Sequence, residues 1–299
     1  MRTVLIGSVG SSKVVLEEMI RAEFPITKVY GLDETKSRNV SGYVPIHKIA
    51  EKKSISYRTF SNINDNVTVE DLRKEKPDYI FVIGLSQLVG KEILEIAEKG
   101  VIGFHPTPLP RFRGRAAMVW QMLLGVRESK CTMFFIDEGM DSGDIIGQEP
   151  YVIEEDDYAE DVSRKSQDAL RVLIKRVMKE MLSDSLNLVK QKEEEATYLL
   201  KRTPEDGKID WSNPVQDIQL LIRAVSHPYP GAFSLYEGQH KVIIWRADYL
   251  ENHKYIGIPG QIAEISDQYI DIVGVGGLLR VYQYDNVDDV RLVVGHKFK

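Results

Sequence analysis

Short apolar segments alternate with amphipathic ones through the first 180 residues. The apolar segments TVLIG, ITKVYGL, DYIFVIG and GVIGFH are typical of buried strands. The intervening segments SKVVLEEMIRA, VTVEDLRKEK and KEILEIAEK carry apolar residues at helical spacing. Strands that alternate with helices indicate βαβ units. We therefore predict an α/β domain of the Rossmann-like kind with a mostly parallel sheet.

The pattern changes after residue 182. The helical block AEDVSRKSQDALRVLIKRVMKEML is followed by SLNLVKQKEEEATYLLKRTPEDGKIDW, which loses periodicity and predicts a linker with a solvated KQKEEE run. VQDIQLLIRAVSH then predicts a helix. Short strands are predicted for FSLYEG, HKVIIWRAD, GQIAEIS, QYIDIVG and GLLRVYQYD, and they indicate a small OB-like β-barrel. We expect two domains, residues 1–200 and 201–299.

The composition is that of an ordinary globular protein, with 43% hydrophobic residues, 28% charged residues and a net charge of −6. No apolar run approaches the length of a membrane span. The start, MRTVLIGSVGSS, predicts a strand rather than a signal peptide, so we expect a cytoplasmic protein. Cys131, the single cysteine, lies in the apolar run CTMFFI and predicts a buried, unreactive thiol. The histidines lack the close spacing of ligand pairs, so no metal site is predicted.

Two residues between positions 103 and 144 are candidates for catalysis. His105 lies in the turn HPTPLPRFRG, whose prolines restrict the backbone, and Asp144 ends the loop DEGMDSGD. Histidine side chains ordinarily titrate near neutrality, and a histidine that acts as a base needs a carboxylate that orients its ring. We predict that His105 accepts a proton and that Asp144 holds its ring. The alternative is that His105 caps a turn and Asp144 only forms one.

A second candidate site follows the first predicted strand. The turn GSVGSS contains Ser8 and Gly10 and leads directly into a helix. N–H groups at the start of a helix can bind a phosphate group of a substrate. The dinucleotide pattern GxGxxG is absent, so a plain strand-to-helix turn is the alternative.

Several segments together resemble the folate-dependent formyltransferases, a family that includes methionyl-tRNA and sugar N-formyltransferases. The resemblance is carried by GVIGFHPTPLPRFRGRAAMVWQMLLG, DEGMDSGDII, VLIGS…LEEMI and KRTPEDGKIDW…IRAVSHPYPGAF, which cover nearly the whole chain. It implies N10-formyltetrahydrofolate as the formyl donor, with its pterin held by two loops. Carried onto this sequence, those loops consist of Leu85, Ser86, Gln87, Leu88 and Val89, and of Glu138, Gly139, Met140 and Asp141. Ordinary turns without a ligand are the alternative for both loops.

The chain departs from the family pattern at Gly103, where the family has an asparagine that is thought to bind the developing oxyanion. Loss of one oxyanion donor costs about 2.7–4 kcal/mol in other enzymes. Three groups could bind the oxyanion in place of this asparagine. They are protonated His105 alone, a water or backbone N–H admitted by the small Gly103, or the side chain of Ser86 or Gln87. Catalytic impairment is the fourth possibility.

The acceptor is predicted from charge. Arg113 and Arg115, in RFRGR, either form structural salt bridges or bind a substrate phosphate. Residues 201–299 contain 11 Lys or Arg and 13 Asp or Glu, without the basic stripe of a tRNA-binding domain. We therefore expect a nucleotide-linked amino-deoxysugar as the acceptor, as in surface polysaccharide biosynthesis, and no nucleic acid partner. The alternatives are a methionyl-tRNA formyltransferase and a non-catalytic protein that binds folate or a nucleotide sugar. The sequence leaves open whether the chain forms a homodimer.

Overall fold

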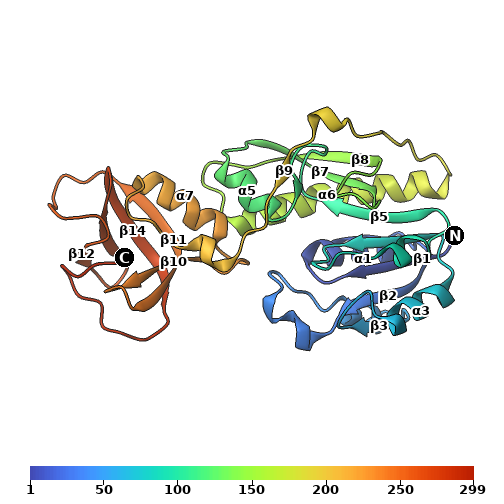
Figure 1. The fold of residues 1–299 in the computed structure, drawn as a ribbon, viewed down its shortest axis with the longest axis horizontal. Helices are drawn as coiled ribbons and strands as arrows, with labels where there is room; N and C mark the ends of the chain where they lie inside the picture. The colour runs from blue at the N-terminus through green and yellow to red at the C-terminus, as the bar shows by residue number, and fades with distance from the viewer. The chain divides into compact units, whose positions relative to one another are not determined.

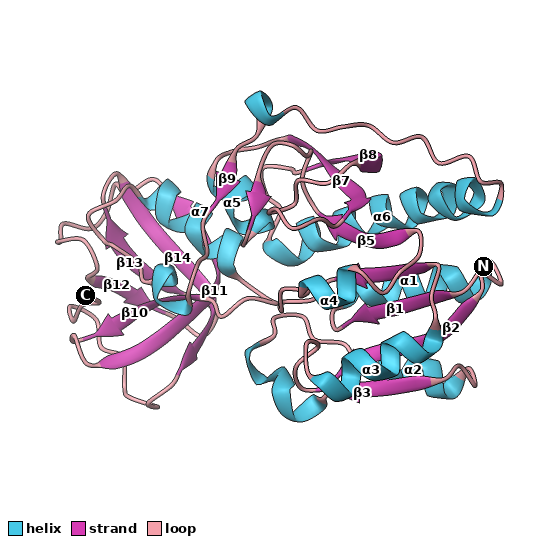
Figure 2. Ribbon diagram, turned by 45° about the vertical axis from the view of Figure 1, so that its right-hand side comes forward, coloured by secondary structure: helices cyan, strands magenta, loops and turns pink.

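The computed structural model describes residues 1–299, and the chain divides into two compact units. The first unit comprises Met1–Ala117, Glu128–Val152 and Ser163–Leu200, and the second comprises Met118–Arg127, Ile153–Val162 and Lys201–Lys299. Each unit is built around its own sheet (Figures 1 and 2). The chain therefore enters the second unit twice before its final 99 residues, through two short segments that lie far apart in the sequence.

The sheet of the first unit has seven strands in the order β3-β2-β1-β4-β5-β7-β8. Strands β1 to β5 pair in parallel, whereas β7 and β8 pair antiparallel at one side of the sheet. The predicted mostly parallel sheet is confirmed. The strands are β1 Thr3–Gly7, β2 Ile26–Leu32, β3 Tyr57–Phe60, β4 Tyr79–Ile83, β5 Gly100–His105, β7 Glu128–Phe135 and β8 Ile145–Val152.

Helices cover both faces of this sheet (Figure 1). α3 and α4 cover one face, and α1, α2 and the larger part of α6 cover the other. These helices are α1 Gly10–Arg21, α2 Ile46–Lys52, α3 Asn66–Glu75, α4 Lys91–Leu94 and α6 Ala159–Leu182, whereas α5, Ala117–Leu123, belongs to the second unit except for its first residue. The segment KEILEIAEK gives only the four-residue α4, because the N–H groups of Glu98 and Lys99 already bond to the carbonyls of Pro77 and Asp78. No helix is both long enough and apolar enough to cross a bilayer.

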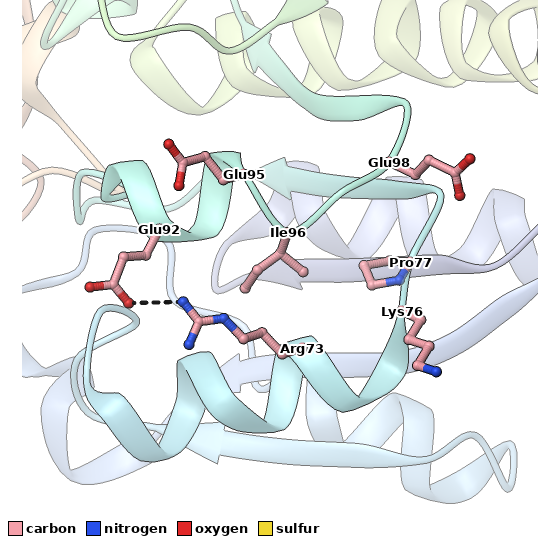
Figure 3. A pocket seen from close by; sticks show the side chains of 7 residues that line it. All are labelled: Arg73, Lys76, Pro77, Glu92, Glu95, Ile96 and Glu98. Carbon is pink, nitrogen blue, oxygen red and sulfur yellow. Dashed lines mark hydrogen bonds and ion pairs between the residues drawn. The ribbon is translucent and has the colours of Figure 1, made fainter.

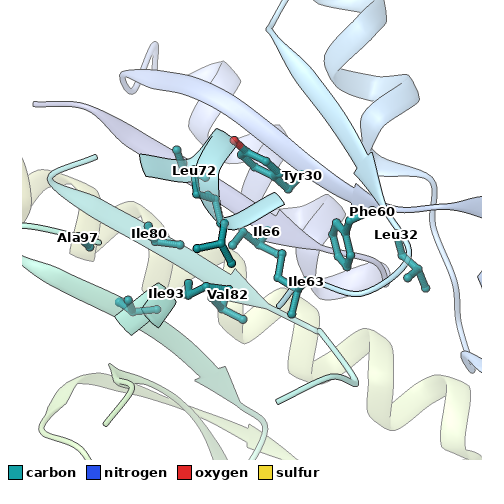
Figure 4. Close-up of a cluster of buried hydrophobic side chains, with 13 residues drawn as sticks. Ile6, Tyr30, Leu32, Phe60, Ile63, Leu72, Ile80, Val82, Ile93 and Ala97 are labelled. Carbon is teal, nitrogen blue, oxygen red and sulfur yellow. The ribbon is translucent and has the colours of Figure 1, made fainter. Parts of the chain in front are cut away.

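A cluster of buried side chains fills the face under α3 and α4 (Figure 4). Alternate residues of the strands, such as Ile6, Tyr30 and Ile80, meet Leu72 of α3 and Ile93 of α4. This alternation is what the period of a strand requires of a sheet that is covered on both faces. The core therefore fixes the carboxyl ends of β1, β4 and β5 side by side at one edge of the sheet.

Cys131 lies in β7 and is fully buried. Burial raises the pKa of its thiol to about 12, because a thiolate would lose its hydration in the core. The thiol is therefore neutral at physiological pH and has no contact with solvent. The predicted burial of this cysteine is confirmed.

A short two-stranded ribbon links the segment after α6 to the turn that follows β5. The strand β6, Arg113–Gly114, pairs in parallel with β9, Tyr198–Leu199. Most of the predicted linker is exposed, as expected, including the single helical turn η2, Glu193–Glu195. Gln191 is only partly exposed, and its side chain turns toward the protein.

The second unit contains a five-stranded antiparallel sheet in the order β10-β11-β14-β13-β12, against which α7 packs. Its elements are the helical turn η3 Pro204–Gly207, α7 Val215–Val225, β10 Ala232–Tyr236, β11 His240–Leu250, β12 Ile262–Ile265, β13 Ile270–Gly274 and β14 Gly277–Asn286. Isolated bridges join Phe298 to Tyr236 and Lys297 to Gln261, beside the two outer strands. The antiparallel C-terminal domain is as predicted, whereas the closure of an OB-like barrel stays a prediction.

Candidate active site

His105 is the last residue of β5 and lies at the edge of the sheet where the parallel strands end. Its side chain is buried, and its Nε2 lies 2.8 Å from the carbonyl oxygen of Phe112. A carbonyl oxygen only accepts hydrogen bonds, so Nε2 carries the hydrogen of the neutral ring. Nδ1 therefore carries the lone pair and is the nitrogen that can accept a proton.

The backbone of Phe112 is held in an unusual conformation. Its φ is +64°, in the left-handed region that bulky residues rarely adopt. The Phe112 N–H donates to Oγ1 of Thr197 at 2.8 Å, and the hydroxyl of Thr107 donates to the Arg111 carbonyl oxygen at 3.1 Å. Strain of this kind persists where surrounding contacts determine the backbone. The turn thus fixes the carbonyl group that orients the ring of His105.

The carboxylate that faces His105 is that of Asp141. The distance from Nδ1 of His105 to Oδ2 of Asp141 is 3.8 Å, which exceeds the usual hydrogen-bond range of about 2.7–3.2 Å. The same oxygen accepts a hydrogen bond of 2.8 Å from the N–H of Gly114. Asp141 has a left-handed backbone, with φ of +51°. The two side chains therefore face each other across a gap that one small polar group can bridge.

The prediction that Asp144 holds the ring of His105 is wrong. The carbonyl oxygen of Asp144 accepts a bond from the N–H of Phe135, so Asp144 lies at the base of the β7–β8 hairpin. Its neighbour Gly143 is so close to β7 that an added Cβ would lie 1.8 Å from the Phe135 oxygen. The Asp144 carboxylate forms no hydrogen bond or ion pair with a protein group, whereas that of Asp141 lies 3.8 Å from Nδ1 of His105. Asp141, three residues earlier in the loop, reaches His105 instead.

The space beside Gly103 is filled by apolar side chains. A Cβ at this position would lie 2.9 Å from Cγ1 of Ile136 and 3.0 Å from Cζ of Phe134. The small residue therefore does not leave room for a water in the direction of its missing side chain, and that replacement for the asparagine is not supported. Ile136 occupies the place toward which an asparagine side chain would extend.

Gln87 is bonded to the loop after β3, but one of its two Nε2 hydrogens has no partner within the protein, and its role as an oxyanion donor stays a prediction. Its Oε1 accepts from the N–H of Ile63 at 2.8 Å, and its Nε2 donates to the Ser61 oxygen at 2.8 Å. The side chain thus fastens the turn after β4 to the loop after β3. Ser86 is exposed and its hydroxyl has no protein partner, so its predicted role stays a prediction.

The two predicted cofactor loops lie next to each other. Nζ of Lys91, directly after residues 85–89, lies 3.0 Å from Oε1 of Glu138. Leu88 is 78% exposed and Met140 is 56% exposed, although both are large apolar residues. Leu85 and Val89 pack on the core beneath, and Gly139 donates its N–H to Asp137 within a tight turn. The structure brings these loops together, and their contact with a cofactor stays a prediction.

The side chains of Ser8 and Ser12, in the turn after β1, form hydrogen bonds within the protein. Ser8 is fully buried and donates its hydroxyl to the Gly84 oxygen at 3.1 Å. Oγ of Ser12 accepts from the N–H groups of Ser8 and Val9 and thereby caps α1. A Cβ at Gly10 would lie 2.8 Å from Nε2 of Gln167 in α6. The hydroxyls of Ser8 and Ser12 are therefore used within the protein, and the binding of a substrate phosphate by N–H groups at the start of α1 stays a prediction.

Of the two predicted arginines, only Arg115 can meet a substrate. Arg113 is 1% exposed and binds Oε1 of Gln191, the carboxylate of Glu193 at 2.8 Å and the hydroxyl of Tyr198 at 3.0 Å. Its proposed contact with a substrate phosphate is therefore wrong, and the structural alternative holds. Arg115 is exposed, and its guanidinium has no protein partner.

Sequence reasoning missed three residues at this site, namely Phe112, Gln191 and Thr197. Gln191 stands within a charged run, and Thr197 lies where periodicity is lost. Their roles depend on contacts with residues 50 to 85 positions away, such as the bonds from Gln191 to the Asp141 loop and from Phe112 to Thr197. No local pattern could have indicated them.

A separate hollow of about 440 Å³ lies between α3 and α4 (Figure 3). Its residues include Lys76 and Pro77, which precede β4, and Glu98, which precedes β5. It therefore opens at the amino ends of these strands, at the opposite edge of the sheet from His105. Its wall carries charges of both signs and contains none of the predicted site residues.

Comparison with known proteins identifies the family of the chain. A family model described as formyl transferase matches residues 28–178, and a model of the formyl transferase C-terminal domain matches residues 201–286. Among solved structures, HypX from Aquifex aeolicus is similar with a TM-score of 0.72 and 18% identity over 96% of this chain. This chain spans 44% of the length of that protein.

Two other solved structures match over nearly their whole length. The N-formyltransferase from Helicobacter canadensis, solved with folinic acid and dTDP-3-aminofucose, has a TM-score of 0.67 and 19% identity, covering 95% of this chain and 99% of that one. The methionyl-tRNA formyltransferase from Clostridium thermocellum has a TM-score of 0.62 and 21% identity, covering 92% and 99%. At these identities the likeness shows a shared fold. The first family model alone covers just over half of the residues, and the chain therefore belongs to the formyl transferase family of enzymes.

Proposed function

We propose that this protein is an N-formyltransferase that moves the formyl group of N10-formyltetrahydrofolate to the amine of a nucleotide-linked amino-deoxysugar, in surface polysaccharide biosynthesis. The observation that carries the proposal is the pair formed by His105 and Asp141, with 3.8 Å between Nδ1 and Oδ2. One ring nitrogen is fixed as a donor to the Phe112 oxygen, and the other faces a carboxylate. This arrangement suits removal of a proton from an attacking amine.

The chemistry requires a C–N bond to form between the amine and the formyl carbon while the bond from that carbon to N10 of the folate breaks. The amine loses a proton, and Nδ1 of His105 accepts it. The Asp141 carboxylate then stabilises the imidazolium that results. An amine nitrogen about 3 Å from both Nδ1 and Oδ2 could donate one N–H to each, which would orient its lone pair toward the formyl carbon. N10 of the departing tetrahydrofolate gains the proton that the amine lost.

The folate is proposed to bind between the loop of residues 85–89 and the loop of residues 138–141. Leu88 and Met140 offer exposed apolar surface there, and a pterin ring would cover such surface. The ion pair of Lys91 with Glu138 holds the two loops together beside it. A related protein of similar fold, the Helicobacter canadensis enzyme, was solved with folinic acid. When bound, N10-formyltetrahydrofolate supplies the formyl group.

The oxyanion is proposed to be stabilised without a side-chain amide. Ile136 fills the place beside Gly103, and Gln87 is bonded elsewhere. The other candidates of the sequence are protonated His105, a backbone N–H and Ser86, whose exposed hydroxyl has no protein partner. The imidazolium forms as the amine loses its proton, so it gains its charge when the oxyanion also develops.

The charge of the C-terminal unit favours a sugar acceptor over tRNA. Residues 201–299 carry 11 basic and 13 acidic residues, and several of the basic side chains are already paired. Arg280 binds Asp271 through two bonds of 2.8 Å, Arg246 binds Glu160 and Lys254 binds Glu264. Cations that are neutralised in this way add little to the attraction of a nucleic acid backbone. The free guanidinium of Arg115 is the proposed contact for a diphosphate.

One assay tests the proposal. The protein is incubated with N10-formyltetrahydrofolate and either a panel of nucleotide-linked amino sugars or methionyl-tRNA, and release of tetrahydrofolate is followed. Turnover with an amino sugar is the expected result. Turnover with methionyl-tRNA and with none of the amino sugars would show that the acceptor is the tRNA and not a nucleotide-linked sugar. Binding of folate without turnover on any acceptor would indicate a binding protein and refute the proposed function.

A further inference from the structure

The segment of residues 189–199, which we call the strap, follows α6 and lies beside the catalytic pair. Val189 exchanges two backbone hydrogen bonds with Ile145, at 2.8 and 2.9 Å, and the other end of the strap forms β9. We propose that Gln191 and Thr197 of the strap are positioning residues, which fix Asp141 and His105 relative to each other. This inference rests on the proposed function, because it concerns the rate of the same transfer.

Gln191 holds the loop that carries Asp141. Its Nε2 donates to the carbonyl oxygens of Asp141 and Gly143, each at 2.8 Å. These two bonds use both hydrogens of the amide group. They fasten the loop on each side of Ser142, and Asp141 has a left-handed backbone that needs such support. The side chain of Gln191 therefore determines where the Asp141 carboxylate lies.

Arg113 in turn fixes the amide of Gln191. Nε and Nη2 of Arg113 donate to Oε1 of Gln191 at 3.2 and 3.0 Å. The guanidinium is buried, and Glu193 and Tyr198 bind its other side. All hydrogen-bonding positions of the Gln191 amide are therefore used, and the amide can adopt only one orientation. The residue after Arg113, Gly114, donates its N–H to the Asp141 carboxylate, so one short strand supports both ends of this network.

Thr197 acts on the other member of the pair. Its Oγ1 accepts the N–H of Phe112, whose carbonyl oxygen accepts from Nε2 of His105. The N–H of Thr197 itself donates to the Pro110 oxygen at 3.4 Å. Thr197 thus supports the left-handed turn that fixes the ring. One segment of eleven residues therefore contacts the backbone on both sides of the 3.8 Å gap.

A change of Gln191→Glu tests the first half of the proposal. The variant keeps the oxygen that Arg113 binds, and adds a charge that complements the guanidinium, but it replaces the two N–H donors by an oxygen that repels both carbonyls. We expect kcat to fall about 10- to 100-fold, because a displacement of about 1 Å can cost a factor of that size. The variant should stay folded, with a modestly lower melting temperature because the two bonds are lost, and circular dichroism checks this. Wild-type kcat in Gln191→Glu, or a loss confined to the folate KM, would overturn the proposal.

A double-mutant cycle separates positioning from general support of the fold. If Gln191 acts through Asp141, then Gln191→Glu in an Asp141→Asn background should lower kcat by less than about threefold further. Independent effects that multiply would show that Gln191 does not act through Asp141. Lys192→Gln is the matched control, because its exposed side chain contacts only Glu195, and it should keep wild-type kcat. An inactive wild type would refute the proposed function instead.

Thr197 supplies a second pair of variants. Thr197→Val has nearly the same shape but leaves the Phe112 N–H without an acceptor, whereas Thr197→Ser keeps the hydroxyl. We expect Thr197→Val to lower kcat about tenfold and Thr197→Ser to restore most of it. Equal activities in the two variants would show that the hydroxyl does not position His105.

Discussion

Two turns at the same edge of the sheet, one after β1 and one after β5, contain polar residues that the sequence offered as candidate site residues. In the turn after β1, Ser8 and Ser12 satisfy the hydrogen bonds of their own turn and of the neighbouring strand. In the turn after β5, Nδ1 of His105 faces Asp141 across 3.8 Å and has no hydrogen-bond partner in the protein. The side chains of Ser8 and Ser12 are therefore satisfied without a ligand, whereas Nδ1 of His105 is not.

This difference shows which polar groups are available for chemistry. A buried polar group normally has a partner within the protein, and an open position in a structured, partly buried site points to a substrate. The two turns also differ in backbone strain. Phe112, Ala116 and Asp141, around the second turn, have left-handed backbones, whereas no non-glycine residue from 1 to 22 does. Strained residues that surrounding contacts hold in place are often found at functional sites.

The largest effect should come from the catalytic pair. His105→Ala and Asp141→Asn are each expected to lower kcat by about 10²- to 10⁴-fold, because the base or the group that stabilises its charged form is lost. Steady-state release of tetrahydrofolate measures the change, and circular dichroism checks the fold. Asp144→Asn is the control, since this carboxylate contacts no catalytic group, and it should lower kcat less than about tenfold. A larger loss of kcat in Asp144→Asn than in Asp141→Asn would refute the assignment of Asp141 to the catalytic pair.

The turn after β1 should respond in stability rather than in rate. Ser12→Ala removes a buried hydroxyl that accepts from the Ser8 and Val9 N–H groups and donates to the Ile83 oxygen. We expect a loss of about 2–4 kcal/mol in the free energy of unfolding, since several buried groups become unsatisfied. Denaturation in urea measures it. Ser11→Ala, in which the hydroxyl has no protein partner, should cost less. A large fall in kcat in folded Ser12→Ala would instead make this turn part of the active site.

Much of the fold followed from the sequence because hydrophobic periodicity is a local property. The strands TVLIG and GVIGFH, the 24-residue helix α6 and the five C-terminal strands were all visible in this way. The antiparallel pair β7 and β8 was not, because ESKCTMFF and IIGQEPYV mix polar and apolar residues without a clear period. A strand that pairs at the side of a mixed sheet needs no continuous apolar run.

The site was only partly predictable, for a related reason. His105 stands at the end of a strand, and a strand end is a position that sequence can locate. Whether Asp141 or Asp144 faces the ring of His105 depends on where the loop between β7 and β8 begins and ends. The close contact of Gly143 with Phe135 sets that point. Arg113 was likewise ambiguous, because its burial depends on partners in a segment about 80 residues away. Such choices require three-dimensional contacts.

Gly103 allows a test of how tightly the second turn is built. Gly103→Asn should destabilise the protein by about 1–3 kcal/mol, because its side chain would collide with Ile136. The double variant with Ile136→Ala should recover part of this loss by creating space. Urea denaturation and kcat of both variants provide the measurement. If Gly103→Asn alone is as stable as the wild type and more active, the site has an unoccupied oxyanion position, contrary to the packing described.

The turn after β4 lies between the other two in the order of the sheet, and its expected effect is the smallest. Gln87 forms two hydrogen bonds within the protein, while Leu88 stays exposed. The pair of Lys91 with Glu138 joins this turn to the catalytic loop, and Glu138 raises the pKa of Lys91, so the ammonium group stays charged at neutral pH.

Lys91→Gln should therefore raise the KM for the formyl donor only about two- to threefold, since exposed ion pairs contribute little. High salt should diminish the difference from the wild type, because screening weakens the wild-type pair. Lys99→Gln is the matched control, since its exposed pair with Asp184 lies at the amino end of β5, away from the site. A fall in kcat rather than a rise in KM would mean that the turn after β4 positions the catalytic loop. This turn would then contribute to catalysis, as the turn after β5 is proposed to do.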